Sequence, residues 1–551
     1  MSLCMGSDRG DVALFVSLLL FALLLGGCGD SHTATGAAPD AGPDPTRVTV
    51  AGGALEGDVV GGSARFLKIP YAKPPTGALR WKAPQAADAW AGVRHEASFA
   101  SPCPQPPSQQ TAGSTNEDCL YLNVWRPKAA THGAPVMVWL HGGGLTTGSA
   151  ADIVPLTSKF LWYNGQVFAE SGVVLVTLNY RLGVFGFFAH QELPGEGSPL
   201  GNQGLLDQRF ALEWVKSNIA AFGGDPGNVT IFGQSAGSGS VCMHVASPGS
   251  RGLFHRAISE SGGCTTSGAT DFSAINTQIT TFAGNHGCTG AMTLDCLRAL
   301  PADQLVSSMY VDRTMGMAAL TTAFAFGAVV DGPGGFMPKP PKDQFAAGDV
   351  AKVPYMLGST NDEARLYYIS ATVPASETDY QSWLQTTYGT FASRVGALYP
   401  SSKFGGDYRL TVARIATDSG VVCGTLDTAR RASAAGLPGV YMYNFNIDWS
   451  VAPTLFGPCH TSEISHVFGV PYMVNAASAA VSDAMNHYWG AFARTGNPNF
   501  TGAPGKWPAF GPDAQGADSR IQFDLSPGYE TLMGFRKDEC QLWADYAATQ
   551  P

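Results

Sequence analysis

The stretch GLLDQRFALEWVKSNIAAFGGDPGNVTIFGQSAGS, residues 204–238, decides the fold class. Its first half places Leu206, Phe210 and Trp214 at helical spacing, and the run GGDP at 223–226 then ends the helix. The apolar, β-branched run that follows is typical of a buried strand. A helix that leads into a strand in this way predicts part of a parallel strand–helix–strand unit.

Four further runs are short, largely apolar and rich in β-branched or aromatic residues: 136–143, 173–180, 353–359 and 440–446. Such runs are typical of buried strands in a covered sheet. The run at 173–180 precedes the helix, so it completes the unit, and parallel strands need such a crossover. The sequence therefore predicts an α/β fold built on one large sheet.

The composition fits a large folded body without a nucleic-acid partner. The chain has 551 residues, of which 45% are hydrophobic and 14% are charged, so it can bury a large core. Its formal net charge of −10 comes with no visible basic patch, and nucleic-acid binding needs one. We therefore expect no nucleic acid among its partners.

The N-terminal residues predict an export signal. The apolar run at 12–25 has the length of a signal-peptide core and is too short for a comfortable membrane span. It ends in LGGC, which resembles the lipobox of bacterial lipoprotein signals, where the cysteine is lipidated. We expect residues 1–27 to be the signal and Cys28 to carry the lipid. An ordinary secretory signal cleaved near Gly27 is the alternative.

Residues 28–46 are rich in Ala, Gly, Pro and Asp. A segment of this kind cannot bury enough apolar surface to fold, so it predicts a flexible tether. Gly29, directly after the cysteine, resembles the outer-membrane-bound form of such signals. The expected location is therefore the outer membrane, through the lipid anchor alone, with secretion as the alternative.

Ser235 lies between Gly233 and Gly237 in a G-x-S-x-G pattern, after a predicted strand and before a run of small residues. Glycine tolerates the close approach of the chain at the flanking positions, so a sharp strand-to-helix turn can expose the serine oxygen. The helix that follows directs free N–H groups and its positive end toward a developing oxyanion. The pattern predicts Ser235 as a nucleophile.

A second glycine turn lies upstream, where the strand run ends in HGGG at 141–144. Three glycines leave backbone N–H groups unshielded by side chains, which suits the other half of an oxyanion hole. We predict the N–H groups of Gly143, Gly144 and Ala236 as the donors. His141 is expected to have a structural role.

Several blocks of the sequence resemble one family. They are EDCLYLNVW (117–125), LNYRLGVFGF (178–187), the stretch at 201–238, ISESG (258–262) and VVDG (329–332). Over roughly residues 47–545 the chain resembles the type-B carboxylesterases, the cholinesterase-like branch of the α/β-hydrolases. The resemblance implies one α/β-hydrolase domain at 47–551, with a large mixed, mostly parallel sheet covered by helices on both faces. It also implies hydrolysis of small-molecule esters with no metal and no cofactor.

The resemblance points to His460 as the catalytic base. The run HTSEISHVFG begins at His460 and matches a family pattern in a loop after a late strand. His466, six residues later, is the rival, at a position where the family usually has an aromatic residue. A serine hydroxyl needs such a base, because alone it is a poor nucleophile.

The acid of the triad should lie between the serine and the histidine in chain order. The run LGSTNDEA resembles the family's G-x-x-x-x-E and implies Glu363 rather than Asp362, which the residues alone do not rank. By the same resemblance, Ser261 is expected to form a hydrogen bond near the triad.

These assignments give a mechanism. Ser235 attacks an ester carbonyl with His460 as base and Glu363 holding the imidazole, and water then hydrolyses the acyl-enzyme. Protonated His460 cannot act as a base. Activity is therefore expected to fall as the pH drops through about 6.5, the ordinary pKa of histidine.

Eleven cysteines are consistent with an oxidising compartment. Cys103 and Cys119 lie close in the sequence, as do Cys288 and Cys296, and both pairs predict local disulfide loops. Nine cysteines remain outside the signal and the lipid site, so at least one is expected to be unpaired within the chain.

The resemblance implies a further disulfide between Cys423 and Cys540, with Cys423–Cys459 as the alternative. A bond between Cys264 and Cys459 near the site is a separate hypothesis. Cys242, on the helix after the nucleophile, is expected to be a buried thiol.

One departure from the cholinesterases bears on the substrate. Their first disulfide loop carries a tryptophan that binds a quaternary ammonium group. Here the loop between Cys103 and Cys119 contains no aromatic residue. We therefore do not expect specificity for choline esters. The alternatives are a lipase, a drug- or antibiotic-ester hydrolase, or a non-catalytic binding protein of this family. The oligomeric state stays open.

Overall fold

The computed structural model describes residues 46–550, apart from short gaps at 109–112, 130–131, 154–160, 266–268, 291–292, 310–325, 451, 471–472, 513–515 and 526–527. The predicted signal at 1–27, the lipidation site Cys28 and nearly all of the predicted tether lie outside the described residues. The chain from Pro45 onward forms one compact unit. Of the helices that the structure describes, none is both long enough and apolar enough to cross a membrane.

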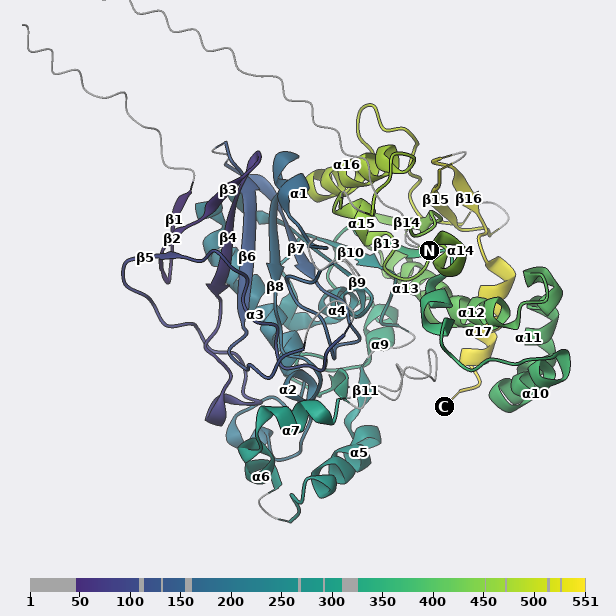
Figure 1. Cartoon of the computed structure of the whole chain (residues 1–551), viewed down its shortest axis with the longest axis horizontal. Coiled ribbons are helices and arrows are strands. Elements are labelled where there is room, and N and C mark those ends of the chain that lie inside the picture. The colour runs from purple at the N-terminus through teal and green to yellow at the C-terminus, as the bar shows by residue number, and fades with distance from the viewer. Residues whose placement is uncertain are drawn as a thin grey trace, which may run out of the picture. The chain divides into compact units, whose positions relative to one another are not determined.

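A mixed sheet of eleven strands runs through the described part of the chain (Figure 1). In spatial order its strands are β16 (Thr531–Met533), β15 (Ser519–Phe523), β14 (Val440–Phe445), β13 (Tyr355–Thr360), β10 (Arg256–Glu260), β9 (Gly224–Gln234), β7 (Ala134–Leu140), β8 (Val174–Leu178), β6 (Tyr121–Pro127), β4 (Ser63–Pro70) and β3 (Asp58–Val60). From β15 to β8 all neighbouring strands are parallel, and the outer pairs are antiparallel. The sheet is therefore mostly parallel, with antiparallel edges.

Two small sheets accompany the large one. They consist of β1 (Arg47–Val50), β2 (Gly53–Glu56) and β5 (Val93–His95), and of β11 (Thr270–Asp271) with β12 (Val329–Val330). The described α-helices are α1 (Gln166–Glu170), α2 (Gly183–Phe187), α3 (Gln203–Asn218), α4 (Ala236–Ala246), α5 (Phe272–Asn285), α6 (Thr293–Ala299), α7 (Ala302–Ser307), α9 (Pro341–Ala346), α10 (Glu377–Tyr388), α11 (Ala392–Leu398), α12 (Tyr408–Thr417), α13 (Cys423–Ala434), α14 (Pro453–Phe456), α15 (Ile464–Val467), α16 (Ala479–Thr495) and α17 (Lys537–Ala547).

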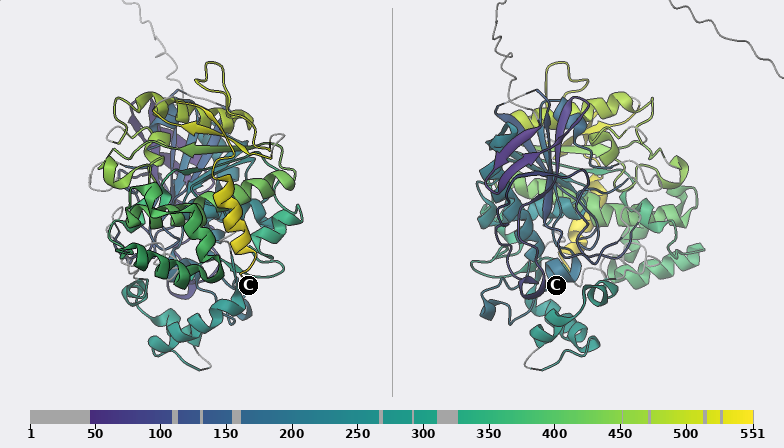
Figure 2. Two further views of the ribbon diagram at one scale, coloured as in Figure 1. Left: turned by 90° about the vertical axis from the view of Figure 1, so that its right-hand side faces the viewer. Right: turned by 60° about the vertical axis from the view of Figure 1, so that its left-hand side comes forward.

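Helices cover both faces of the large sheet because its central strands are apolar on both sides (Figure 2). All seven residues of β7 are buried, and successive side chains of a strand point to opposite faces. Val138 belongs to the core beneath α3, α4 and α13, whereas Trp139 belongs to the core beneath α1 and α16. The prediction of an α/β-hydrolase fold with a mostly parallel sheet covered on both faces is confirmed.

The strand–helix–strand unit predicted around residues 204–238 is β8–α3–β9. The two strands are parallel and lie on either side of β7, so α3 provides the crossover. The helical stretch ends at Gly223, whose φ of 82° is in the left-handed region that favours glycine. β9 begins at Gly224, earlier than the predicted Val229, because Gly224 already pairs with Ala134 of β7. The other predicted strands appear as β7, β13 and β14.

Four disulfides stabilise the described residues. Three of them join the pairs expected from the sequence, namely Cys103–Cys119, Cys288–Cys296 and Cys423–Cys540. The last of these connects α13 to the C-terminal helix α17 across 117 residues. Both Cys423 and Cys540 are thereby used, so the alternative bond from Cys423 to Cys459 is not formed.

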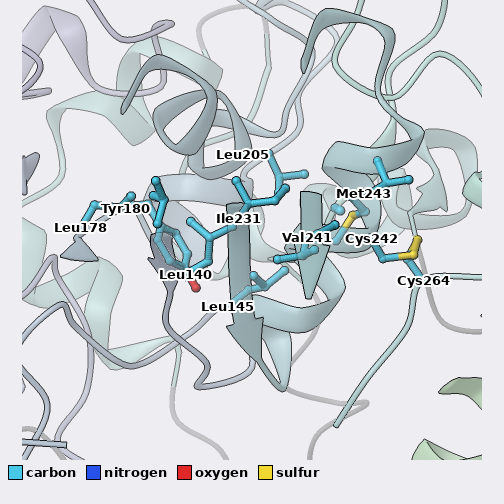
Figure 3. Packing of buried hydrophobic residues seen from close by; sticks show 14 of the residues in the cluster. Leu140, Leu145, Leu178, Tyr180, Leu205, Ile231, Val241, Cys242, Met243 and Cys264 are labelled. Atoms are coloured by element: carbon cyan, nitrogen blue, oxygen red, sulfur yellow. A yellow bond between two sulfur atoms is a disulfide. The ribbon is translucent and has the colours of Figure 1, made fainter. Parts of the chain in front are cut away.

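The fourth disulfide corrects two expectations. Cys242 is bonded to Cys264 (Figure 3), so it is not a free thiol, and Cys264 does not pair with Cys459. The reason is that α4 packs against β10, which brings the helix beside the loop that follows this strand, and the two Cα atoms are 5.6 Å apart. Cys459 is the free cysteine among the described residues, and it is buried.

The long disulfide predicts a measurable difference in stability. Replacing both Cys423 and Cys540 by serine should lower the free energy of unfolding by about 2–5 kcal/mol, because a bond that closes a long loop restricts the unfolded chain most. The matched control replaces Cys288 and Cys296, whose bond spans only 8 residues. Thermal unfolding under non-reducing conditions should show the smaller loss for the control. Equal losses for the two double variants would contradict this account.

Candidate active site

Ser235 occupies the turn between β9 and α4, in a conformation that few residues adopt. Its φ of 59° and ψ of −122° place a non-glycine residue in the left-handed half of backbone space, which is strained. Two backbone hydrogen bonds hold it there: its N–H donates to the carbonyl of Glu260 at 2.9 Å, and its carbonyl accepts from Gly239 at 3.0 Å. The side chain is half-buried, so a substrate can reach it.

The glycines on either side make this turn possible. A Cβ atom at Gly237 would lie 2.0 Å from the carbonyl oxygen of Leu140, and one at Gly233 would lie 2.5 Å from the same oxygen. Both distances are far shorter than a carbon and an oxygen can approach. The end of β7 therefore passes so close to the turn that only glycine fits at these two positions.

The HGGG turn lies beside Ser235. A Cβ atom at Gly142 would be 3.1 Å from the Cβ of Ser235. Gly143 and Gly144 have φ of 106° and 65°, and the carbonyl of Gly143 accepts hydrogen bonds from Thr146 and Thr147. Within the described residues, the N–H groups of Gly143 and Gly144 have no protein acceptor. The N–H of Ala236, the first residue of α4, also belongs to the unpaired first turn of a helix.

Glu363 and His460 are in direct contact. Nδ1 of His460 lies 2.5 Å from Oε2 of Glu363, and the backbone N–H of His460 donates to the Glu363 carbonyl at 3.2 Å. The other carboxylate oxygen, Oε1, accepts from the N–H of Thr360 at the end of β13, at 2.7 Å. Glu363 is completely buried, so both of its oxygens are fixed within the protein. An Nδ1–H donated to Glu363 leaves Nε2 as the atom that can accept a proton.

Two opposing effects set the pKa of His460. Burial by itself would lower the pKa, but the negative charge of Glu363 and its hydrogen bond raise it, and the net result lies above the ordinary value of 6.5. The expected loss of activity at low pH is therefore centred above 6.5 rather than at it.

The imidazole ring of His460 lies beside the side chain of Gln234 in this structure. The amide nitrogen of Gln234 lies 3.2 Å from Nε2 and 3.5 Å from Nδ1, so it is close to both ring nitrogens rather than in line with the lone pair of Nε2. Among the described residues, Ser235 Oγ forms no hydrogen bond with His460.

The rival histidines lack an acidic partner. Nδ1 of His466 contacts the carbonyl of Ser462 at 3.4 Å, and burial lowers its pKa to about 4. His141 stacks on Tyr180 at a ring separation of 4.3 Å, and burial lowers its pKa to about 4 as well. Both therefore remain neutral structural residues, in line with the expectation for His141.

Asp362 does not approach His460. It forms ion pairs with Arg365, at 3.4 Å, and with Arg414. The carboxylate next to Glu363 in the sequence is thus directed toward arginines, and Glu363 alone is directed toward the imidazole.

Ser261 does not contact the Glu363–His460 pair directly. Its φ is 57°, and its hydroxyl donates to Oε1 of Glu463 at 2.7 Å.

Sequence reasoning assigned no role to Glu463, to Glu260 or to Gln234. The signals were nonetheless present, because Glu463 is the glutamate of HTSE, Glu260 is that of SESG, and Gln234 directly precedes the serine.

Within the ranges that the structure describes, no three His, Cys, Asp or Glu side chains are grouped so that they could hold a metal ion. The site instead combines a half-buried serine hydroxyl, a histidine paired with a buried glutamate, and a set of free backbone N–H groups. Such an arrangement can transfer an acyl group.

Comparisons with known proteins agree with this geometry. The model of the Carboxylesterase family matches residues 44–543. A liver carboxylesterase from Sus scrofa is 37% identical over 495 aligned residues, which cover 81% of this chain and 83% of the relative. The family match includes all of the site residues described above, from His141 to His466.

The steric account of the turn predicts a contrast between two glycines of α4. Gly237→Ala should lower the free energy of unfolding by about 1–3 kcal/mol, since its Cβ has no room beside Leu140. Gly239→Ala is the matched control, because its Cβ would meet other atoms only at 3.8 Å and beyond, and alanine favours a helix. Thermal unfolding followed by circular dichroism distinguishes them. Equal stability of the two variants would refute the close approach.

Proposed function

The chain belongs to the carboxylesterase family and is a carboxylic-ester hydrolase, and we propose that it cleaves its esters through Ser235, His460 and Glu363 by way of an acyl-enzyme. The observation that carries this proposal is the buried 2.5 Å contact between His460 and Glu363, beside Gln234, which directly precedes Ser235 in the strained turn. A serine, a histidine and a carboxylate in these roles form the triad of serine hydrolases.

The first half of the reaction forms the acyl-enzyme. Ser235 Oγ attacks the ester carbonyl while Nε2 of His460 takes its proton, and Glu363 stabilises the resulting imidazolium. The carbonyl oxygen becomes an oxyanion that accepts hydrogen bonds from the N–H groups of Gly143, Gly144 and Ala236. Preorganised donors of this kind are worth several kcal/mol each in the transition state.

The second half restores the enzyme. The tetrahedral intermediate expels the alcohol, which leaves with the proton from His460. Water then attacks the acyl carbonyl with His460 again as the base, and the carboxylic acid is released as the proton returns to Ser235 Oγ. Ser261 takes part only through Glu463, as a residue that supports the loop carrying His460.

The substrate class we propose is a small-molecule carboxylic ester. The relative with the matching sequence is named a carboxylesterase. The loop closed by Cys103 and Cys119 has no aromatic residue for a quaternary ammonium, so choline esters are not proposed. A lipase or a drug-ester hydrolase differs from this proposal in acyl chain length, and a binding protein differs by the lack of turnover.

For the cellular location we propose export with a lipid anchor. The four disulfides are typical of an exported protein. The proposed division into a signal at 1–27, a lipidated Cys28, a tether over 28–46 and one hydrolase domain at 47–551 rests on the sequence pattern. Mass spectrometry of the N-terminal peptide from the native host would show diacylglycerol on Cys28, or an unmodified N-terminus if the signal is an ordinary one.

Replacing the nucleophile tests the proposal directly. Ser235→Ala should lower kcat by about 10⁴–10⁶-fold for p-nitrophenyl esters, because no other group can form the acyl-enzyme. Ser240→Ala, a buried serine of the same helix, is the matched control and should retain activity. An ester series from acetate to palmitate then separates an esterase from a lipase. Turnover by Ser235→Ala comparable to wild type would exclude the mechanism.

The two neighbouring carboxylates provide a second test. Glu363→Gln should lower kcat by about 10⁴-fold, since an amide cannot stabilise the imidazolium and favours the wrong tautomer. Asp362→Asn has the same change of charge one residue away, but Asp362 pairs with arginines, so its kcat should stay within about tenfold of wild type. Steady-state kinetics on p-nitrophenyl acetate measures both. The reverse order of the two effects would make Asp362 the acid.

A further inference from the structure

Two additional glutamates lie behind the proposed triad. Glu260 is the last residue of β10 and Glu463 directly precedes α15. Both are completely buried, as is Glu363, so three carboxyl groups share one interior region. Across the described residues, no lysine or arginine forms an ion pair with Glu260 or Glu463, and the positive charge that acts on Glu463 is that of His460.

Each of the two glutamates has one side-chain hydrogen-bond donor within the described residues. The Ser261 hydroxyl donates to Oε1 of Glu463 at 2.7 Å, and the indole N–H of Trp489, from α16, donates to Oε1 of Glu260 at 2.7 Å. The backbone N–H of Glu463 also acts on its own carboxyl, but the Oε2 atoms of both glutamates are buried without a partner in the described structure. An ionised carboxylate accepts up to four hydrogen bonds, and burying it with so few donors is costly. A protonated carboxyl avoids most of that cost.

The buried hydroxyl of Tyr443, on β14, also indicates that this region contains few charges. This hydroxyl is completely buried and has no hydrogen-bond partner among the described residues. Burial, and then the charges of Glu260, Glu463 and Glu363, raise the pKa of Tyr443 well above its usual value. The hydroxyl is therefore within electrostatic range of all three carboxyl groups, although it forms no hydrogen bond with any of them among the described residues. It is a neutral group that can donate to one carboxyl oxygen and accept from a protonated one.

The other titratable groups near the pair are also neutral. Burial, and then Asp152, raise the pKa of the Tyr163 hydroxyl well above its usual value, and Glu260 adds to this effect. Burial, and then Glu363 and Glu463, raise the pKa of the Cys459 thiol in the same way. Among the described residues, His460 is therefore the group that can bring a positive charge to this region, and it acts on Glu463.

Glu363 differs from the other two carboxyl groups in its hydrogen bonds. Its two oxygens accept from Thr360 and His460, whereas Glu260 and Glu463 each have an unpartnered oxygen. Burial, and then repulsion by Glu463, raise the pKa of Glu260 well above its usual value. Burial, and then repulsion by Glu363, raise the pKa of Glu463 to about 7, against the opposing charge of His460.

We propose that Glu260 and Glu463 are positioning residues that hold protons behind the base: Glu260 stays a neutral acid, and Glu463 shares one proton with His460. The inference rests on the proposed triad. Its consequence is that His460 faces one negative charge, from Glu363, near neutral pH. Three negative charges would keep the imidazole protonated and unable to accept the proton of Ser235.

The two groups then titrate together. Starting from low pH, the first proton can leave either His460 or Glu463, and these two states have the same total charge. Of these two states, the one with neutral His460 and protonated Glu463 is active. The other, with protonated His460 and ionised Glu463, is inactive, and Glu463→Gln removes it because an amide cannot ionise. His460 then loses its proton at lower pH.

The pH dependence of kcat/KM for p-nitrophenyl acetate tests the proposal. In wild type the acid limb should lie above pH 6.5. In Glu463→Gln it should move to lower pH by about one unit. Glu260→Gln should leave the limb in place, because a neutral amide replaces a neutral acid. Asp418→Asn is the matched control: burial raises the pKa of this carboxyl to about 7, and Asp418 is not among the groups that shift the pKa of His460. Its limb should not move.

Coincident acid limbs for wild type and Glu463→Gln would overturn the role of Glu463. A Glu260→Gln limb shifted to lower pH would show that Glu260 is ionised, which would overturn its role as a neutral acid. A merely structural role of Glu463 would change kcat or stability without moving the limb. The pH profile therefore separates positioning from packing for Glu463, and the infrared measurement below does so for Glu260.

A measurement without turnover keeps the inference separate from the proposed function. Infrared spectroscopy of Ser235→Ala at neutral pH should show carbonyl bands of protonated carboxyl groups, and adding Glu260→Gln should remove one of them. Absence of a band attributable to Glu260 would overturn the inference even if Ser235→Ala has lost all esterase activity. Presence of that band in a chain whose wild type hydrolyses no ester would instead reject the proposed function and leave the protonation of Glu260 standing.

Discussion

The close approach of one backbone oxygen to a sharp turn is the constraint on which the site depends. The carbonyl of Leu140 at the end of β7 lies against Gly233 and Gly237, so β9 and α4 can meet only through glycine. This contact places Ser235 in its strained conformation, and the hydrogen bond from its N–H to Glu260 ties the turn to β10. The same end of β7 continues into the HGGG turn. One steric condition at the carboxyl edge of three parallel strands thus fixes both the exposed serine and the free N–H groups beside it.

Few charged groups lie in the buried region around His460. Glu363 contacts His460, which can become positively charged. Among the described residues, no second positively charged side chain acts on this region. The neighbouring Asp362 has two arginines, outside this region. Glu260 and Glu463 accept hydrogen bonds from neutral donors, Trp489 and Ser261, whereas an acid at the surface often pairs with lysine or arginine. A buried charge without a partner is costly, so the fold keeps the number of charges beside the imidazole small.

The fold could be predicted largely from local patterns, because strand periodicity and glycine spacing around Ser235 act over a few residues. The choice of Glu363 over Asp362 could not be predicted from local patterns, because both residues follow the same strand. They differ in the positions of two arginines in three dimensions, and the prediction of Glu363 needed the family resemblance. The bond between Cys242 and Cys264 was missed for a related reason. It depends on α4 packing against β10, and a buried cysteine on a helix has the same sequence pattern whether it is free or bonded. The same holds for the glutamates behind His460, whose role follows from burial in three dimensions.

The backbone angle at position 235 also limits which amino acid can serve there. A β-branched side chain is a severe outlier at positive φ, because its second Cβ substituent meets the backbone. Threonine, which is a nucleophile in other enzymes, is therefore excluded from this turn on conformational grounds alone. Cysteine is not excluded, since its side chain branches no earlier than that of serine. The geometry that exposes the hydroxyl thus restricts this position to nucleophiles whose Cβ is unbranched, such as the hydroxyl of serine or the thiol of cysteine.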